Sequence, residues 1–163
     1  MFTPVFNFKF DFDIDALLMA YTEIRHFRKR RPHHNCWKVE IDQINNPAAN
    51  YIKKEFKRLE NTVNIPLKSI ISMDYDKDGW VDWHKDEWDA IGCRINLLLT
   101  EPYPIEFENG FYDFKFAVVD VNQKKHRFTN KDKKERIILK AVINTHSYEE
   151  VCELFTQASL NLK

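Results

Sequence analysis

Residues with metal-binding side chains stand close together in the middle of the chain. His84 and Asp86 lie two positions apart in DYDKDGWVDWHKDEW, and alternate residues of an extended chain project to the same side. One imidazole nitrogen and one carboxylate oxygen could therefore grip a single divalent ion. This donor pair suits iron, and a mononuclear non-haem iron centre completes it with a second His. Because H-x-D is a short motif, the second His must be sought downstream.

The next His, His126, begins the first of two apolar-bearing runs, 126–129 and 135–143, which a polar turn separates. Asn130-Lys131-Asp132 separates these runs, and the simplest interpretation is a β-hairpin centred near Lys131. Such a hairpin pairs His126 with Arg136 on one face, with Cβ atoms roughly 5 Å apart. A guanidinium beside a metal ligand can bind one carboxylate of a dicarboxylate whose other end chelates the metal. A shift of one residue in the register would destroy this arrangement.

The constellation resembles the Fe(II)/2-oxoglutarate-dependent dioxygenases. In order and type, the four residues match the H-x-D, the distal His and the following Arg of that superfamily. The resemblance implies that His84, Asp86 and His126 bind Fe(II) and form the catalytic centre. It also implies that Arg136 pairs with the distal carboxylate of the co-substrate 2-oxoglutarate, and that dioxygen is the oxidant.

A segment just after the first ligands points to one branch of the superfamily. The sequence CRINLLL, which contains Arg94, looks like the strand that helps hold 2-oxoglutarate in the aspartyl/asparaginyl β-hydroxylases and proline hydroxylases. Asn96 stands where some aspartyl/asparaginyl hydroxylases carry another His. By the same resemblance, Ser72 or Tyr75 lends a hydroxyl group to the co-substrate. The expected substrate is an amino acid or an amino-acyl side chain of a polypeptide, which the enzyme hydroxylates.

The pattern of elements predicts a mainly β, α+β fold. Short strands separated by turns at this spacing are typical of a cupin-like jelly roll, or double-stranded β-helix, whose interior holds a small ligand. We expect residues 1–163 to form one domain with flanking helices. The expected strands are 5–12, 37–41, 67–73, 94–99, 105–107, 112–116, 117–121, 126–129 and 135–143, and the expected helices are 15–30, 46–61 and 148–160.

Caps and charges define the helix ends. Asp13 or Asp15 is expected to cap the first helix, Asn46-Pro47 to start the second and Ser147 to cap the last. The basic run Arg28-Lys29-Arg30-Arg31 is interpreted as a solvated helix end that complements the helix dipole. A patch that binds acidic ligands is the alternative for this run.

Composition excludes several classes of partner. The chain has 25 basic and 25 acidic residues and a formal net charge of zero, so we expect neither nucleic acid nor a membrane as partner. Three Cys without a C-x-x-C motif favour reduced thiols and a cytoplasmic protein. The N-terminal stretch does not resemble a secretory signal, and the oligomeric state stays open.

Two further classes of function are open. The stretch Asp74 to Asp82 resembles the start of a calcium-binding EF-hand loop, but Lys85 occupies the twelfth position, where a bidentate Glu is needed. A non-catalytic, cupin-like metabolite-binding protein would share the barrel and would not need Arg136. Trp83 and Trp88 flank the metal-binding motif and are candidates for substrate contacts, or for packing at the barrel mouth.

Overall fold

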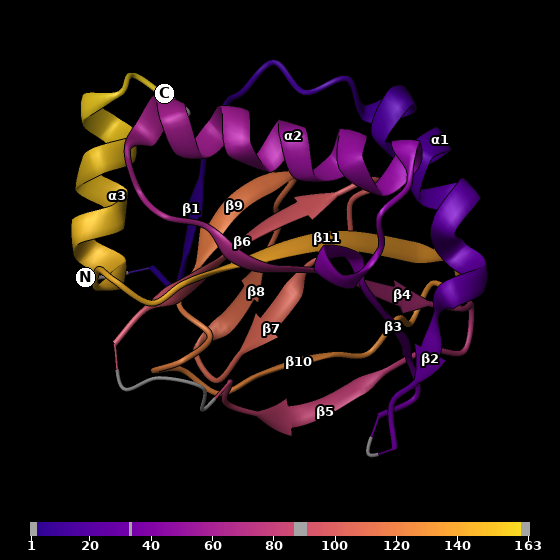
Figure 1. Ribbon diagram of the computed structural model, residues 1–163. Coiled ribbons are helices and arrows are strands. Elements are labelled where there is room, and N and C mark those ends of the chain that lie inside the picture. The colour runs from indigo at the N-terminus through magenta and orange to yellow at the C-terminus, as the bar shows by residue number, and fades with distance from the viewer. Residues whose placement is uncertain (1–2, 33, 87–90, 161–163) are drawn as a thin grey trace.

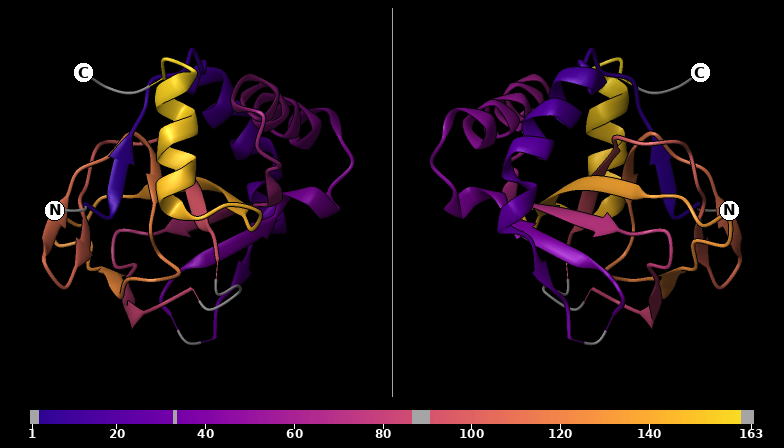
Figure 2. Two further views of the ribbon diagram at one scale, coloured as in Figure 1. Left: turned by 90° about the vertical axis from the view of Figure 1, so that its left-hand side faces the viewer. Right: turned by 90° about the vertical axis from the view of Figure 1, so that its right-hand side faces the viewer.

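Two antiparallel β-sheets face each other, and three helices cover the outer side of the larger sheet (Figures 1 and 2). The computed structural model describes residues 3–32, 34–86 and 91–160. The larger sheet has the order β1-β9-β6-β11-β4-β3-β2, with the bounds Val5–Asn7, Phe116–Val119, Cys93–Leu98, Arg136–Ile143, Lys68–Tyr75, Trp37–Glu40 and Lys29–Arg30. The smaller sheet has the order β5-β10-β7-β8, with the bounds Val81–His84, His126–Phe128, Ile105–Phe107 and Gly110–Tyr112. This architecture confirms the predicted jelly roll.

Alternating side chains of the larger sheet divide the interior into two cores. Along β11, Ile137 and Leu139 point to the helices, whereas Ile138 points to the smaller sheet. The first core lies between the larger sheet and the helices. The apolar faces of three helices pack there: α1 (Ile14–Ile24), α2 (Pro47–Val63) and α3 (Tyr148–Gln157). Complete burial of a residue such as Leu139 contributes roughly 2 kcal/mol. The second core lies between the two sheets, and several of its residues, such as Met73 and Ile105, also line a cavity there.

The predicted helix caps are present. The Asp13 carboxylate accepts a hydrogen bond from the backbone of α1, and Asn46 does the same for α2, whose first residue is Pro47. Ser147 and Glu150 form a reciprocal capping box on α3. These bonds satisfy backbone N–H groups that a helix start leaves without partners. Within the described ranges, no helix combines the length and apolar character needed to cross a membrane.

The first strand is shorter than its alternating sequence predicts. β1 ends at Asn7, although the Phe8 N–H still donates to Phe116 O at 2.9 Å, and the Phe8 and Phe12 side chains are buried in the core under the helices. The Phe8 ring centroid lies 4.7 Å from that of Phe155 in α3, in an edge-on arrangement. Packing of large rings against the helices therefore overrides the local preference for a strand.

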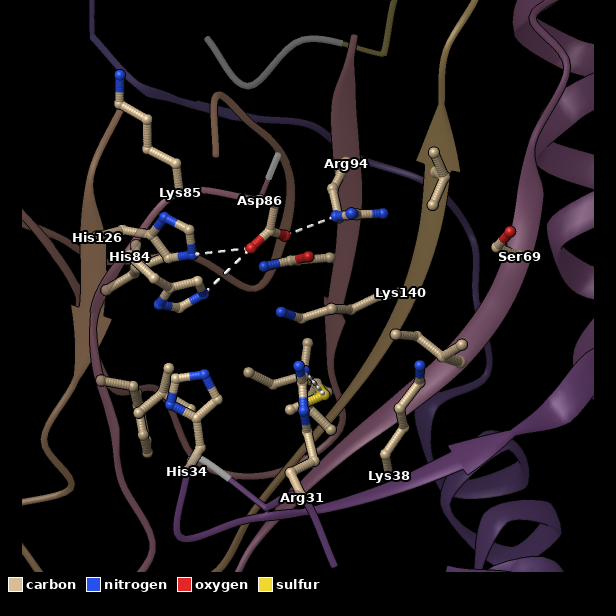
Figure 3. A pocket seen from close by; sticks show the side chains of 18 of the residues that line it. Arg31, His34, Lys38, Ser69, His84, Lys85, Asp86, Arg94, His126 and Lys140 are labelled. Atoms are coloured by element: carbon tan, nitrogen blue, oxygen red, sulfur yellow. Dashed lines mark hydrogen bonds and ion pairs between the residues drawn. The ribbon is translucent and has the colours of Figure 1, made fainter. Parts of the chain in front are cut away.

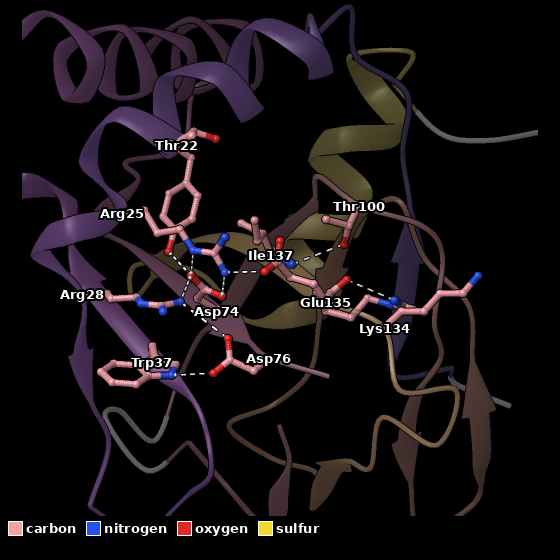
Figure 4. A network of polar contacts seen from close by, with 12 residues as sticks. Thr22, Arg25, Arg28, Trp37, Asp74, Asp76, Thr100, Lys134, Glu135 and Ile137 are labelled. Atoms are coloured by element: carbon pink, nitrogen blue, oxygen red, sulfur yellow. Dashed lines mark hydrogen bonds and ion pairs between the residues drawn. The ribbon is translucent and has the colours of Figure 1, made fainter. Parts of the chain in front are cut away.

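The first helix also ends earlier than expected, at Ile24. A buried carboxylate explains why the following basic residues leave the helix: Asp74 of β4 has a side chain with no exposed surface (Figure 4). It accepts bonds from Nε and Nη2 of Arg25 at 2.8 and 2.9 Å and from the Tyr21 hydroxyl at 2.8 Å. Arg28 Nη1 lies 3.2 Å from the same carboxylate. This network fixes α1 to the sheet.

The same network contradicts the calcium-loop alternative. Asp74 and Tyr75 belong to β4, whereas an EF-hand loop follows a helix. The carboxylates of Asp74, Asp76 and Glu135 do lie within 4.8 Å of one another. Arg25 bonds to Asp74 and Glu135, however, so positive charge is already supplied by side chains.

The predicted hairpin between residues 126 and 136 is wrong. β10 pairs with β5 and β7 in the smaller sheet, and β11 pairs with β4 and β6 in the larger one. His126 therefore lies opposite His84, and Arg136 lies opposite Tyr75. Asn130, with φ 47°, turns the chain from one sheet to the other, and its side-chain amide donates to Asp76 O and Lys134 O, both at 2.9 Å.

Candidate metal centre and cofactor cavity

Two histidines and one aspartate converge at the open end of the barrel (Figure 3). His84 ends β5 and His126 begins β10, and because these strands are antiparallel neighbours, the two residues are direct partners. Asp86 follows β5, where its backbone N–H donates to Val121 O at 2.9 Å. Nε2 of His84 lies 3.1 Å, and Nε2 of His126 3.7 Å, from Oδ1 of Asp86. One ligand atom from each residue thus lies within 4.8 Å of the others.

Backbone carbonyls orient both imidazoles. Nδ1 of His84 lies 2.7 Å from Asp82 O, and Nδ1 of His126 lies 3.2 Å from Lys124 O. A carbonyl oxygen only accepts hydrogen bonds, so Nδ1 carries the proton in each ring. Nε2 of each ring then faces Asp86 and is the nitrogen left for a metal ion.

The electrostatics favour the protonation states of metal ligands. Burial lowers the pKa of His126 to about 3, so its imidazole is neutral at physiological pH. Burial alone would raise the pKa of Asp86, but the hydrogen bond from His84 and the nearby charges of Lys140 and Arg94 hold it well below its usual range. Nε of Arg94 donates to Oδ2 of Asp86 at 2.7 Å. The site therefore presents an ionised carboxylate beside neutral imidazole.

A cavity of about 600 Å³ extends from the triad between the two sheets. Tyr75, Ile138 and Val142 are among the residues that line it. Figure 3 shows the Lys140 side chain, from the centre of β11, reaching into this space toward Asp86. Burial lowers the pKa of Lys140 to about 8. In the part of the chain that the structure describes, no hydrogen bond or ion pair engages its ammonium group.

The predicted co-substrate residues lie in different places. Arg94 lines the cavity and is bonded to Asp86, and Tyr75 also lines it. Ser72 points to the helices instead: its Oγ accepts a bond from Val39 N and donates to the Tyr21 hydroxyl, both at 3.2 Å. The prediction that Ser72 contacts a ligand in the barrel is therefore wrong. Neighbouring strand positions of opposite parity face opposite sides of the sheet.

Arg136 shares the inward face of β11 but lies outside the cavity lining. It stands four residues from Lys140, roughly 13 Å along the strand. Its guanidinium pairs with Asp132, donates to Glu135 O at 3.1 Å and lies 5.2 Å from the centre of the Tyr103 ring. Its side chain is almost fully buried, and Nε has no partner among the described residues. Arg136 therefore already has an acidic partner outside the cavity lining.

Lys140 was missed in the sequence, although a signal for it was present. Lys140 interrupts the apolar run RIILKAVI at a position of the same parity as Arg136, which predicts an inward charge.

Trp83, a predicted substrate contact, is outside the cavity lining, with the Arg127 guanidinium 4.7 Å above its indole ring. Trp88, the other predicted substrate contact, is outside the described residues.

Comparisons with solved structures identify proteins of the same fold. A prolyl-4-hydroxylase from Pseudomonas putida matches 82% of this chain and 88% of its own, with a TM-score of 0.60 and 13% identity. The collagen prolyl hydroxylase of Paramecium Bursaria Chlorella virus-1, solved as a 2OG complex, matches 81% and 91%, with a TM-score of 0.57 and 11% identity. No family model and no curated protein matches the sequence. The shared feature is the jelly-roll fold.

Proposed function

We propose that this protein is an Fe(II)- and 2-oxoglutarate-dependent dioxygenase that hydroxylates an amino acid or a residue of a polypeptide. The observation that carries the proposal is the convergence of His84, Asp86 and His126 at the mouth of a cavity that contains Lys140. The prolyl hydroxylase fold of the structural neighbours supports it. The aspartyl/asparaginyl branch receives no such support, because the neighbours are prolyl hydroxylases.

The donor set fits Fe(II). Two imidazole nitrogens and one carboxylate oxygen that share one side of an ion leave its other positions open for small ligands. His84, Asp86 and His126 would hold the metal, and Arg94 would orient Asp86 through their 2.7 Å hydrogen bond. The carbonyls of Asp82 and Lys124 would keep both Nε2 atoms available.

The cavity also offers a cation for the distal carboxylate of 2-oxoglutarate. Lys140 lines the cavity and forms no ion pair with any described residue, so we assign it this role in preference to Arg136, which pairs with Asp132. Tyr75 is a second candidate, since burial raises the pKa of its hydroxyl group, which stays protonated and can donate to the carboxylate.

The bound metal and co-substrate would supply the oxidising chemistry, in which dioxygen and 2-oxoglutarate are consumed, succinate and carbon dioxide are released and the substrate gains a hydroxyl group. The protein itself would hold both cofactors, orient the substrate and exclude water. Tyr75, Phe128 and Ile138 form buried sides of the cavity and would exclude water from it.

Metal uptake and 2-oxoglutarate turnover test the proposal. The protein is loaded with Fe(II) without oxygen, and succinate is quantified after oxygen and 2-oxoglutarate are added. We expect one iron per chain and slow succinate formation in the wild type and in His26→Ala, a control at an exposed His. His84→Ala and His126→Ala should lose both while remaining folded.

Two results would contradict the proposal. Full iron uptake and turnover in both triad variants would place the ligands elsewhere. A metal-loaded protein that binds no 2-oxoglutarate and forms no succinate would favour the non-catalytic, metabolite-binding alternative.

A further inference from the structure

Positive charge is concentrated around the cavity although the chain as a whole is neutral. Seven of the described residues that line the cavity are Lys or Arg, and two, Glu40 and Asp86, are acidic. The formal net charge of the whole chain is zero, so the rest of the molecule carries a matching negative excess. Such a focused positive field attracts an anionic ligand.

The cofactors of the proposed function do not account for this excess. Fe(II) would bring two positive charges and 2-oxoglutarate two negative ones, which cancel. Several cations of the lining are already paired, as Lys38 is with Glu40 at 2.7 Å. Arg31 forms no ion pair with a carboxylate among the described residues. Its side-chain polar contact is with Met73 Sδ, at 3.8 Å. The Arg31 guanidinium is therefore available to bind an anion from a ligand.

A second groove continues the cavity outward past these same residues. The groove has a volume of about 680 Å³ and shares Arg31, Lys38 and Glu40 with the cavity. It adds Lys29 and Arg30 of β2 to the basic surface. Figure 3 shows Arg31 and Lys38 across the cavity from the triad, and both residues also line the groove. Together the two spaces have a much larger volume than one free amino acid requires.

The strand beside the groove suits an extended chain. β2 is the last strand of the larger sheet and pairs with β3 alone, so one side of its backbone has no strand partner in that sheet. A polypeptide can add to such an edge through main-chain hydrogen bonds. The basic run 28–31, which the sequence suggested is a solvated helix end, instead contributes this strand and the wall of the groove.

We propose that the substrate is an acidic polypeptide segment. The residue to be modified enters the cavity, its flanking carboxylates lie on Arg31 and on Arg30 of the groove, and its main chain follows β2 along the groove. This assignment rests on the proposed function for its chemistry, whereas the binding of the segment is independent of it. A nucleic acid fits less well, because its long polyphosphate backbone would also meet the negative excess outside the groove.

Peptide binding tests the assignment directly. The probes are two fluorescein-labelled pools of 12-residue peptides with a randomised central position, flanked by Glu in one pool and by Gln in the other. Fluorescence anisotropy is measured with the full chain, without added metal and with Mn(II) plus 2-oxoglutarate. We expect the Glu pool to bind about tenfold more tightly at low salt, as two partly screened ion pairs would give, and the preference to shrink as salt increases.

Charge reversal localises the effect. The double variant Arg30→Glu/Arg31→Glu should lose the preference for the Glu pool. Lys54→Glu, a matched reversal at an exposed position of α2 outside both spaces, should keep it. Equal binding of both pools, or the same loss in Lys54→Glu, would overturn the assignment. Displacement of the Glu pool by equimolar free glutamate would also overturn it, and so would tighter binding of a 12-nucleotide single-stranded DNA.

The outcomes separate this inference from the proposed function. An acidic preference in a protein that shows no 2-oxoglutarate complex with Fe(II) would refute the dioxygenase proposal and leave the peptide site standing. A clear Fe(II)–2-oxoglutarate complex without any acidic preference would refute the substrate assignment alone.

Discussion

Replacing Lys140 by Met removes the ammonium group from the cavity and keeps a side chain of similar length. If Lys140 holds the distal carboxylate of 2-oxoglutarate, the variant should bind Fe(II) normally and 2-oxoglutarate weakly. The fold should survive, because the change removes a charge that burial disfavours, as the lowered pKa of Lys140 shows. Arg136→Met is the matched comparison on the same face of the same strand.

The size of the effect follows from the surroundings of the ammonium group. Loss of one member of a desolvated charge pair costs roughly 2 to 5 kcal/mol, or about 30-fold to several-thousand-fold in affinity. Lys140 is only partly buried, and Arg94 and Arg31 are close enough to affect its pKa. Because these cations would still attract the carboxylate, we expect a value near the lower limit, about 30- to 100-fold. Lys140→Arg should retain part of the affinity.

An anaerobic titration of 2-oxoglutarate into the Fe(II)-loaded proteins measures this effect. The affinity of the wild type should also fall as the pH rises through about 8, where Lys140 loses its proton. A bound carboxylate favours the charged form, so binding is strongest below that pH. Unchanged affinity in folded, iron-loaded Lys140→Met would refute the assignment. A large loss in Arg136→Met instead would return the role to the residue that the sequence suggested.

Three further outcomes follow from the fold. Asp74→Ala should lower the free energy of unfolding by about 3 kcal/mol in urea denaturation, because it leaves Arg25 without its buried partner, whereas exposed Asp78→Ala should change it by less than about 0.5 kcal/mol. Calorimetry should detect no calcium binding tighter than about millimolar; micromolar binding that Asp74→Ala abolishes would contradict this interpretation. The pKa of His126 is lowered to about 3, so the unfolded chain binds a proton below pH 6.5 that the folded one does not. Stability should therefore fall by up to about 1.4 kcal/mol per pH unit as the pH drops from 6.5 toward 4.5, and His126→Gln should flatten the slope.

Local spacing was sufficient to predict that His84 and Asp86 lie together, whereas His126 was added by the resemblance, because its place beside His84 depends on the long-range pairing of β10 with β5. His84 and Asp86 are close in sequence, so their proximity depends on one strand and the two residues that follow it. The jelly roll also follows from strand length and turn spacing, which are local properties. The caps at Asp13 and Ser147 could be read from the residue types alone.

Long-range pairing could not be predicted in the same way. Two strands around a polar turn have the same sequence pattern whether they pair with each other or enter opposite sheets, and the left-handed turn at Asn130 decides between these. Parity indicates which face a residue occupies but not its depth. Arg136 and Lys140 share a face, yet only Lys140 lines the cavity. Ser72 and Tyr75 are three positions apart on β4, so their side chains face opposite sides of the sheet and only one of them can face the barrel interior.

The most direct test of the central claim is an anaerobic spectroscopic titration of the protein with Fe(II) and then 2-oxoglutarate. We predict a visible metal-to-ligand charge-transfer band that saturates at one equivalent of each and is missing in His84→Ala and His126→Ala. Absence of the band in a folded, iron-loaded wild type, or its persistence in both variants, would contradict the assignment of the triad as the metal centre of a dioxygenase.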